Sequence, residues 1–151
     1  MFCVGLILGI LSRVFDLTTQ NLGNVFSQLA IWILLGTVIA IYSHSKKQAM
    51  GNILPFCLGM LLTYYATAML TNGVYSKTFL LGWTVFALLS PMFAYFTWMA
   101  KEKGFFPWII RIGIIAVSVL SSVVLFDGLR IYDCIIDLAL VYILFFKQVR
   151  R

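Results

Sequence analysis

The stretch from Lys101 to Arg130 contains the pattern that decides the fold. It reads KEKGFFP, then WIIRIGIIAVSVLSSVVLF, then DGLR. A charged connection is followed by an apolar run with one charge, Arg111, and then by a polar turn. Because a helix needs about 20 mostly apolar residues to cross a bilayer, this stretch predicts a membrane-spanning helix between two short loops.

The same alternation of apolar runs and short polar connections covers the whole chain. Of 151 residues, 62% are apolar, eleven are Lys or Arg and five are Asp or Glu, and the mean hydropathy is +1.01. A soluble domain of this length cannot hide so much apolar surface, because many of its residues must face water. We therefore expect an all-α integral membrane protein, a single compact bundle of six transmembrane helices over residues 1–151. The expected spans are Phe2–Leu17, Val25–Tyr42, Ile53–Thr71, Phe79–Ala100, Trp108–Phe126 and Ile131–Phe146.

The first expected span is the shortest. Its uninterrupted apolar part, Phe2–Leu11, rises only about 15 Å, half of the hydrocarbon thickness of about 30 Å. It spans only if Ser12, Arg13 and Asp16 lie at its far end. We expect a short first helix, and a truncated N-terminus is the alternative.

The distribution of Lys and Arg predicts the orientation. With both chain ends in the cytoplasm, eight basic residues fall on the inner side and three on the outer side. Since cytoplasmic loops carry an excess of Lys and Arg, the chain is expected in the cell membrane as a multi-pass protein with cytoplasmic N- and C-termini. The inner residues are Lys46, Lys47, Lys101, Lys103, Arg111, Lys147, Arg150 and Arg151, and the outer ones are Arg13, Lys77 and Arg130.

Prolines and glycines predict local features of three spans. Pro55 is expected in the first turn of its helix, where a missing N–H has no cost. Pro91 falls in mid-span, so it must free a backbone carbonyl about one turn earlier, and Ser90 is placed to help satisfy it. A packing kink is one interpretation and a hinge or cavity wall is the other. Gly5 and Gly9 form a small-xxx-small motif, which permits close approach of a helix in the bundle or in a partner.

The acidic residues Asp133 and Asp137 are the strongest candidates for a functional site. They are four residues apart and share one face of the last helix. Asp137 lies about 10 Å along the helix from Arg130, where a charged carboxylate costs about 2–3 kcal/mol. Its side chain must therefore face the bundle interior, pair with a cation or be protonated.

Two short stretches resemble each other, Arg13-Val-Phe-Asp16 and Arg130-Ile-Tyr-Asp133. If the first and last helices are neighbours, these four charges converge at the outer end. One interpretation is that they neutralise each other and lock the bundle. The other is an outward-facing polar pocket for a small-molecule or cation ligand, formed by Arg13, Asp16, Arg130, Asp133 and Asp137 with the amide of Gln28. Further polar candidates for its wall are Ser27, Tyr64, Tyr65, Thr67, Trp83 and Thr84.

Several functional classes lack support in the sequence. The chain has one histidine, His44, and three cysteines without metal-ligand spacing, so we expect no metal site. It has neither a glycine-rich phosphate loop nor a Gly-x-Ser-x-Gly motif, and we expect no cofactor and no enzymatic activity. The basic residues are spread over three inner segments, which disfavours nucleic acid as a partner.

Six helices with both ends inside resemble, in outline, the substrate-binding subunits of energy-coupling-factor vitamin transporters. This resemblance covers the architecture only, and it implies that Gly5 and Gly9 meet a transmembrane partner. We therefore expect a transport or solute-binding protein. The alternatives are an accessory or structural subunit of a membrane complex and a proton- or cation-coupled carrier that works as a homo-oligomer.

Overall fold

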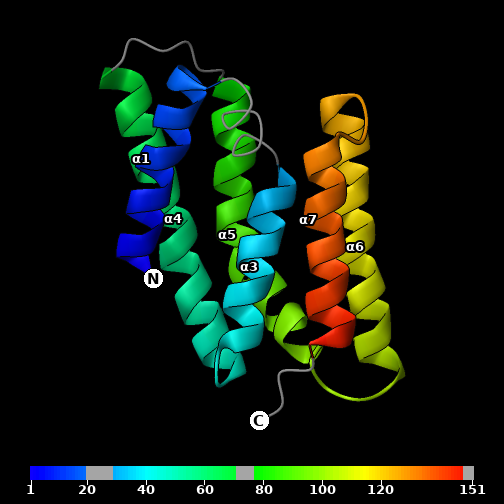
Figure 1. The fold of residues 1–151 in the computed structure, drawn as a ribbon. Coiled ribbons are helices and arrows are strands. Elements are labelled where there is room, and N and C mark those ends of the chain that lie inside the picture. Colours follow the sequence, from blue (N-terminus) through cyan, green and yellow to red (C-terminus); the bar gives the residue numbers. More distant parts are fainter. Residues whose placement is uncertain (20–28, 71–76, 148–151) are drawn as a thin grey trace.

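The computed structural model describes residues 1–19, 29–70 and 77–147, and helices are the only regular structure in these ranges (Figure 1). The prediction of an all-helical chain is confirmed for this part. In chain order the elements are α1 (Phe2–Thr18), α3 (Leu29–Tyr42), α4 (Lys46–Leu70), α5 (Lys77–Met99), α6 (Phe105–Phe126), α7 (Ile131–Val141) and the π-helical turn η1 (Tyr142–Phe146).

Three of the helices in the described ranges are long and apolar enough to cross a membrane. The segments that meet this criterion are Lys46–Thr67 in α4, Leu80–Met99 in α5 and Phe105–Val124 in α6. Shorter apolar helical segments are Phe2–Phe15 and Leu29–Tyr42. Insertion of all six helices and the cytoplasmic location of the termini stay predictions.

The helices pack as two outer pairs around a central pair. Figure 1 shows α1 alongside α4 on one side, the α6–α7 hairpin on the other, and α3 and α5 between them. The main core lies where α3, α4 and α5 meet, around Trp32, Phe56 and Trp98. Consequently α1 and α7 are on opposite sides of the bundle.

Three glycines bring α1 unusually close to α4. A methyl group on Gly59 of α4 would lie 2.7 Å from the carbonyl oxygen of Phe2, and one on Gly9 would lie 2.5 Å from that of Met60. A methyl group on Gly5 would collide with the backbone of α4 as well. The predicted close approach at Gly5 and Gly9 is thus confirmed, and the helix that makes it belongs to the same bundle.

The start of α4 differs from the prediction. This helix begins at Lys46, so Pro55 lies inside it and not in its first turn. The sequence carried a signal for this start: the N–H of Gln48 donates to Ser45 Oγ (3.1 Å), and Gln48 Oε1 accepts from the N–H of His44 (3.1 Å). The Ser45 hydroxyl thus satisfies an open N–H of the first turn, as an N-cap serine does, and the Gln48 side chain holds the N–H of the residue before the cap.

Candidate functional site

Both predicted aspartates of α7 accept hydrogen bonds from groups of the α6–α7 hairpin. Asp133 is fully buried, and its Oδ2 accepts the backbone N–H of Arg130 (3.0 Å), which caps the start of α7. Asp137 is half-buried, and its Oδ1 accepts the hydroxyl of Ser118 on α6 (2.6 Å). The carboxylates therefore face their own hairpin.

Serines on α6 match the spacing of the aspartates on α7. Ser118 and Ser122 are both buried and lie four residues apart. Asp133 and Asp137 have the same spacing. In an antiparallel hairpin in which Ser118 meets Asp137, Ser122 is level with Asp133. Sequence reasoning missed these serines, although their spacing of four was the available signal.

The helices that carry the two resembling stretches, α1 and α7, do not pack against each other. Arg13 lies on α1 and is 8% exposed, with its guanidinium 5.8 Å from the ring centre of Tyr64 on α4. Arg130 is exposed, and its Nη1 donates to Tyr132 Oη (2.8 Å). The charged cluster required the first and last helices to be neighbours. Instead α1 packs on α4, across the bundle from α7.

Two predicted site residues cannot be placed in the site. The side chain of Asp16 lies outside the described part of the structure, although its backbone belongs to α1. Gln28 lies outside the described residues altogether. The polar pocket that these residues were expected to form with Asp133 and Asp137 stays a prediction.

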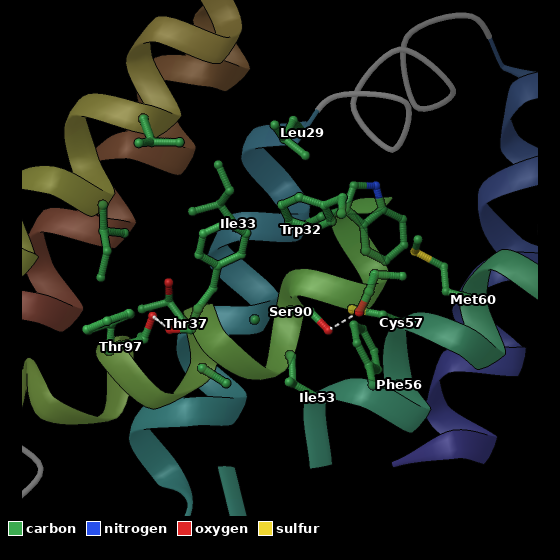
Figure 2. Close-up of a pocket in the computed structure, with 18 of the residues that line it drawn as sticks. Leu29, Trp32, Ile33, Thr37, Ile53, Phe56, Cys57, Met60, Ser90 and Thr97 are labelled. Carbon is green, nitrogen blue, oxygen red and sulfur yellow. Dashed lines mark hydrogen bonds between the residues drawn. The ribbon is translucent and has the colours of Figure 1, made fainter. Parts of the chain in front are cut away.

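The main cavity of the described structure lies elsewhere, between α3, α4, α5 and α6. Its volume is about 440 Å³, and its wall is mostly aromatic and aliphatic. Figure 2 shows Trp32 and Thr37 of α3, Phe56 and Cys57 of α4 and Ser90 of α5 around it. Such a volume lies within the range of small-molecule sites, about 300–1,000 Å³. Neither Asp133 nor Asp137 lines it.

The exposed residues of the cavity wall lie on α5 and α6. Phe93 and Phe96 of α5 are 43% and 40% exposed, and Val117 of α6 is 54% exposed. The wall residues of α3 and α4 are buried or half-buried. The cavity therefore has its mouth between α5 and α6, on the side of the bundle.

A smaller pocket of about 30 Å³ adjoins this cavity and shares Trp32 and Trp83 with it. Its wall adds Tyr64 and Tyr65 of α4 and Ser12 of α1. Three polar aromatic side chains that the sequence suggested for a pocket wall, Tyr64, Tyr65 and Trp83, thus come together. They do so on the α4–α5 side of the bundle, away from the aspartates.

One wall of the cavity is built around the proline of α5. Pro91 cannot donate to the carbonyl of Ala87, and the hydroxyl of Ser90 donates to that oxygen instead (2.6 Å), as predicted. The side chain of Cys57 on α4 is hydrogen-bonded to Ser90. Since the one hydroxyl hydrogen of Ser90 is committed to Ala87, the Cys57 thiol is the donor. Ala87, Ser90 and Cys57 all line the cavity, so the segment of α5 next to Pro91 forms part of the cavity wall.

Residues 1–142 match a model described as a family of unknown function, DUF6518. The chain belongs to this family. No curated protein and no solved structure shows a significant match to the chain. The match includes α1 to α7 and therefore every residue that lines the cavity of this DUF6518 protein.

Replacing Ser90 with alanine is expected to lower the free energy of unfolding by about 1 kcal/mol, because the buried Ala87 carbonyl loses its donor. In a Pro91→Ala background the cost should be smaller, since the restored backbone N–H at position 91 donates to the same oxygen. Unfolding by SDS titration, followed by circular dichroism, measures both values. Equal costs in the two backgrounds would show that the hydroxyl does not serve the carbonyl freed by proline.

Proposed function

We propose that this chain is a multi-pass membrane protein that binds a small, largely apolar molecule in the cavity between α3, α4, α5 and α6. In this proposal all six helices cross the bilayer, both termini are cytoplasmic, and the protein has a solute-binding or transport role. The observation that carries it is the apolar cavity of about 440 Å³.

The surface of the bundle supports a lipid environment. Large apolar side chains are exposed on α1, α4, α5, α6 and α7, among them Ile7, Leu62, Leu81 and Leu138 at 59–68% exposure. In water such a continuous apolar surface would drive aggregation. In a bilayer the same side chains contact acyl chains, and helices satisfy their backbone polar groups internally.

The cavity wall indicates the class of ligand. Aromatic and aliphatic side chains make up most of it, and the hydroxyls of Thr37, Ser90 and Thr97 are the sparse polar groups. Ser90 and Thr97 already donate to backbone carbonyls, so they can only accept a further hydrogen bond, Ser90 through the lone pair that Cys57 does not use. A ring compound with one hydroxyl or amine donor fits this wall, because such pockets use few polar groups to orient an apolar ligand.

The position of the mouth supports entry from the lipid. It lies between α5 and α6, two of the helices that are long enough to cross a membrane. A ligand that enters there need not leave the hydrocarbon before it reaches the cavity. The proposed ligand is therefore lipid-soluble, in contrast to the cation or polar solute that the α7 aspartates suggested.

Filling the cavity mouth with Gly113→Leu is expected to abolish ligand binding. Gly113 lines the cavity, and a methyl group at this position meets no atom within 4 Å, so the Cβ of the leucine can be added without a clash. The probe is a fused-ring alcohol that carries a photoreactive diazirine, applied to the protein in nanodiscs. Mass spectrometry should find adducts on cavity residues that excess unlabelled alcohol suppresses. Gly113→Leu should reduce this saturable labelling about tenfold or more.

The matched control is Gly82→Leu. Gly82 lies in α5 outside the cavity wall, and a methyl group there also has open space. Both substitutions replace a helical glycine, so both should stabilise their helix by nearly 1 kcal/mol. Only Gly113→Leu should lose labelling. Equal labelling of the two variants, or labelling that excess alcohol does not suppress, contradicts the proposal. Co-purification of a constant partner together with such a result would favour the accessory-subunit alternative.

A further inference from the structure

A second cavity, separate from the proposed ligand site, lies at the end of the bundle where α3, α5 and η1 terminate. It has a volume of about 20 Å³ and is lined by three cations, Lys101, Arg111 and Lys147. The remaining wall is apolar, with Ile41 and Leu144 among its residues. Cations from the α5–α6 connection, from α6 and from the end of η1 therefore meet in one small space.

Backbone carbonyls hold two of these cations in place. Lys101 Nζ donates to the oxygens of Ile41 (3.0 Å) and Ser43 (2.9 Å), at the end of α3. Arg111 Nε donates to the oxygen of Ala100 (2.7 Å), just after α5. The cations thus sit at helix C-termini, where partial negative charge stabilises them. Their positions are fixed before any ligand binds.

The positive charge at this end exceeds what the protein supplies to neutralise it. Each of the three helix C-termini contributes a partial charge of about −0.5. The three cations of the pocket contribute one full positive charge each, which is more than these partial charges offset. The sequence places one carboxylate here, Glu102, and it lies 3.6 Å from another cation, Lys46. An anion at the pocket would therefore meet a net positive field.

We propose that Lys101, Arg111 and Lys147 bind the phosphate group of an acidic phospholipid headgroup. A space of about 20 Å³ admits roughly one oxygen-sized group, so a phosphate oxygen enters while the rest of the headgroup stays at the mouth. The Arg111 guanidinium offers a planar set of donors, and the two ammonium groups act as point charges.

The surroundings favour a lipid over free phosphate. Ile41 and Leu144 give the pocket an apolar floor, and Phe146, next to Lys147, is 76% exposed. These side chains suit the boundary between headgroups and acyl chains. Basic pockets between helices on the cytoplasmic side are also where acidic headgroups bind in membrane proteins.

Replacing Lys147 with glutamine is expected to weaken binding of phosphatidylglycerol about tenfold, because one charge-assisted hydrogen bond is lost. Lys147 is exposed at the end of η1, so this variant should keep the thermal stability of the lipid-free protein. Native mass spectrometry of the detergent-solubilised full chain, titrated with phosphatidylglycerol or phosphatidylcholine, measures the affinities. Phosphatidylcholine should bind weakly and equally to both proteins.

The matched controls are Lys47→Gln and Lys103→Gln, which remove one exposed charge each at the same end but outside the pocket. Both should change phosphatidylglycerol affinity by less than about twofold, since neither side chain lines the pocket. A loss equal to that of Lys147→Gln would overturn the proposal in favour of general electrostatic attraction. Displacement of the lipid by millimolar inorganic phosphate would overturn the lipid assignment. Arg111→Lys, which keeps a donor for Ala100, should weaken binding by a smaller factor than Lys147→Gln.

Discussion

Replacing Gly5 with leucine is expected to separate α1 from α4 and to lower the free energy of unfolding by about 3 kcal/mol. The cause is steric, because a Cβ at this position collides with the backbone of Phe56, which cannot move aside as a side chain could. Overpacking of a tight interface typically costs about 1–3 kcal/mol, and a leucine is much larger than the methyl group that already collides. SDS titration in detergent measures the change.

Gly51→Leu is the control for the Gly5 variant. Gly51 lies in α4, and a methyl group there meets no atom within 4 Å. This substitution should stabilise the helix by nearly 1 kcal/mol, because leucine has the higher helix propensity. The two variants should therefore change stability in opposite directions. If Gly5→Leu behaves like Gly51→Leu, α1 does not pack on α4 through its glycines.

Replacing Asp133 with alanine is expected to destabilise the protein by about 2 kcal/mol. The substitution removes the acceptor for the Arg130 N–H at the start of α7, and losing such a cap costs about 0.5–2 kcal/mol. The Asp133 carboxylate is buried and shielded from water. The cost of its loss should therefore lie at the upper end of this range. The free energy of unfolding of the purified protein measures this cost.

The companion variant Asp133→Asn separates capping from charge. Asparagine keeps an acceptor oxygen for the same N–H, so it should cost less than alanine. Neither variant should alter the saturable labelling of the cavity, since Asp133 does not line it. A loss of labelling in Asp133→Asn at unchanged stability would restore a direct ligand role for the α7 aspartates.

The bonds of the α7 aspartates support a stabilising role in the α6–α7 hairpin. Asp133 binds the backbone at the start of its own helix, and Asp137 binds Ser118 across the hairpin. Neither bond involves α1 or Arg13. Of the two interpretations of the charged residues, locking of the structure is thus supported by two hydrogen bonds, one to Ser118 and one to the backbone of Arg130.

For the described residues, the sequence alone was enough to predict the all-helical class and several local features. Apolar runs between polar loops predicted six helices. The observed start of α5, Lys77, is two residues before the predicted one. The Ser90–Pro91 prediction succeeded because the freed carbonyl is one turn away on the same helix. The late start predicted for α4 was avoidable, since Ser45 and Gln48 carried a helix-start signal.

Only the tertiary structure decided which helices are neighbours. In a water-soluble protein an apolar stripe shows which helix face is inside. A helix such as α3 is apolar on nearly all sides, because lipid and protein interior select the same side chains. The sequence therefore predicted close approach at Gly5 and Gly9 and a functional role for Asp137. It did not predict their partners on α4 and α6. For the same reason the cavity between α3, α4, α5 and α6 had no sequence signal, because the adjacency of four apolar helices creates it.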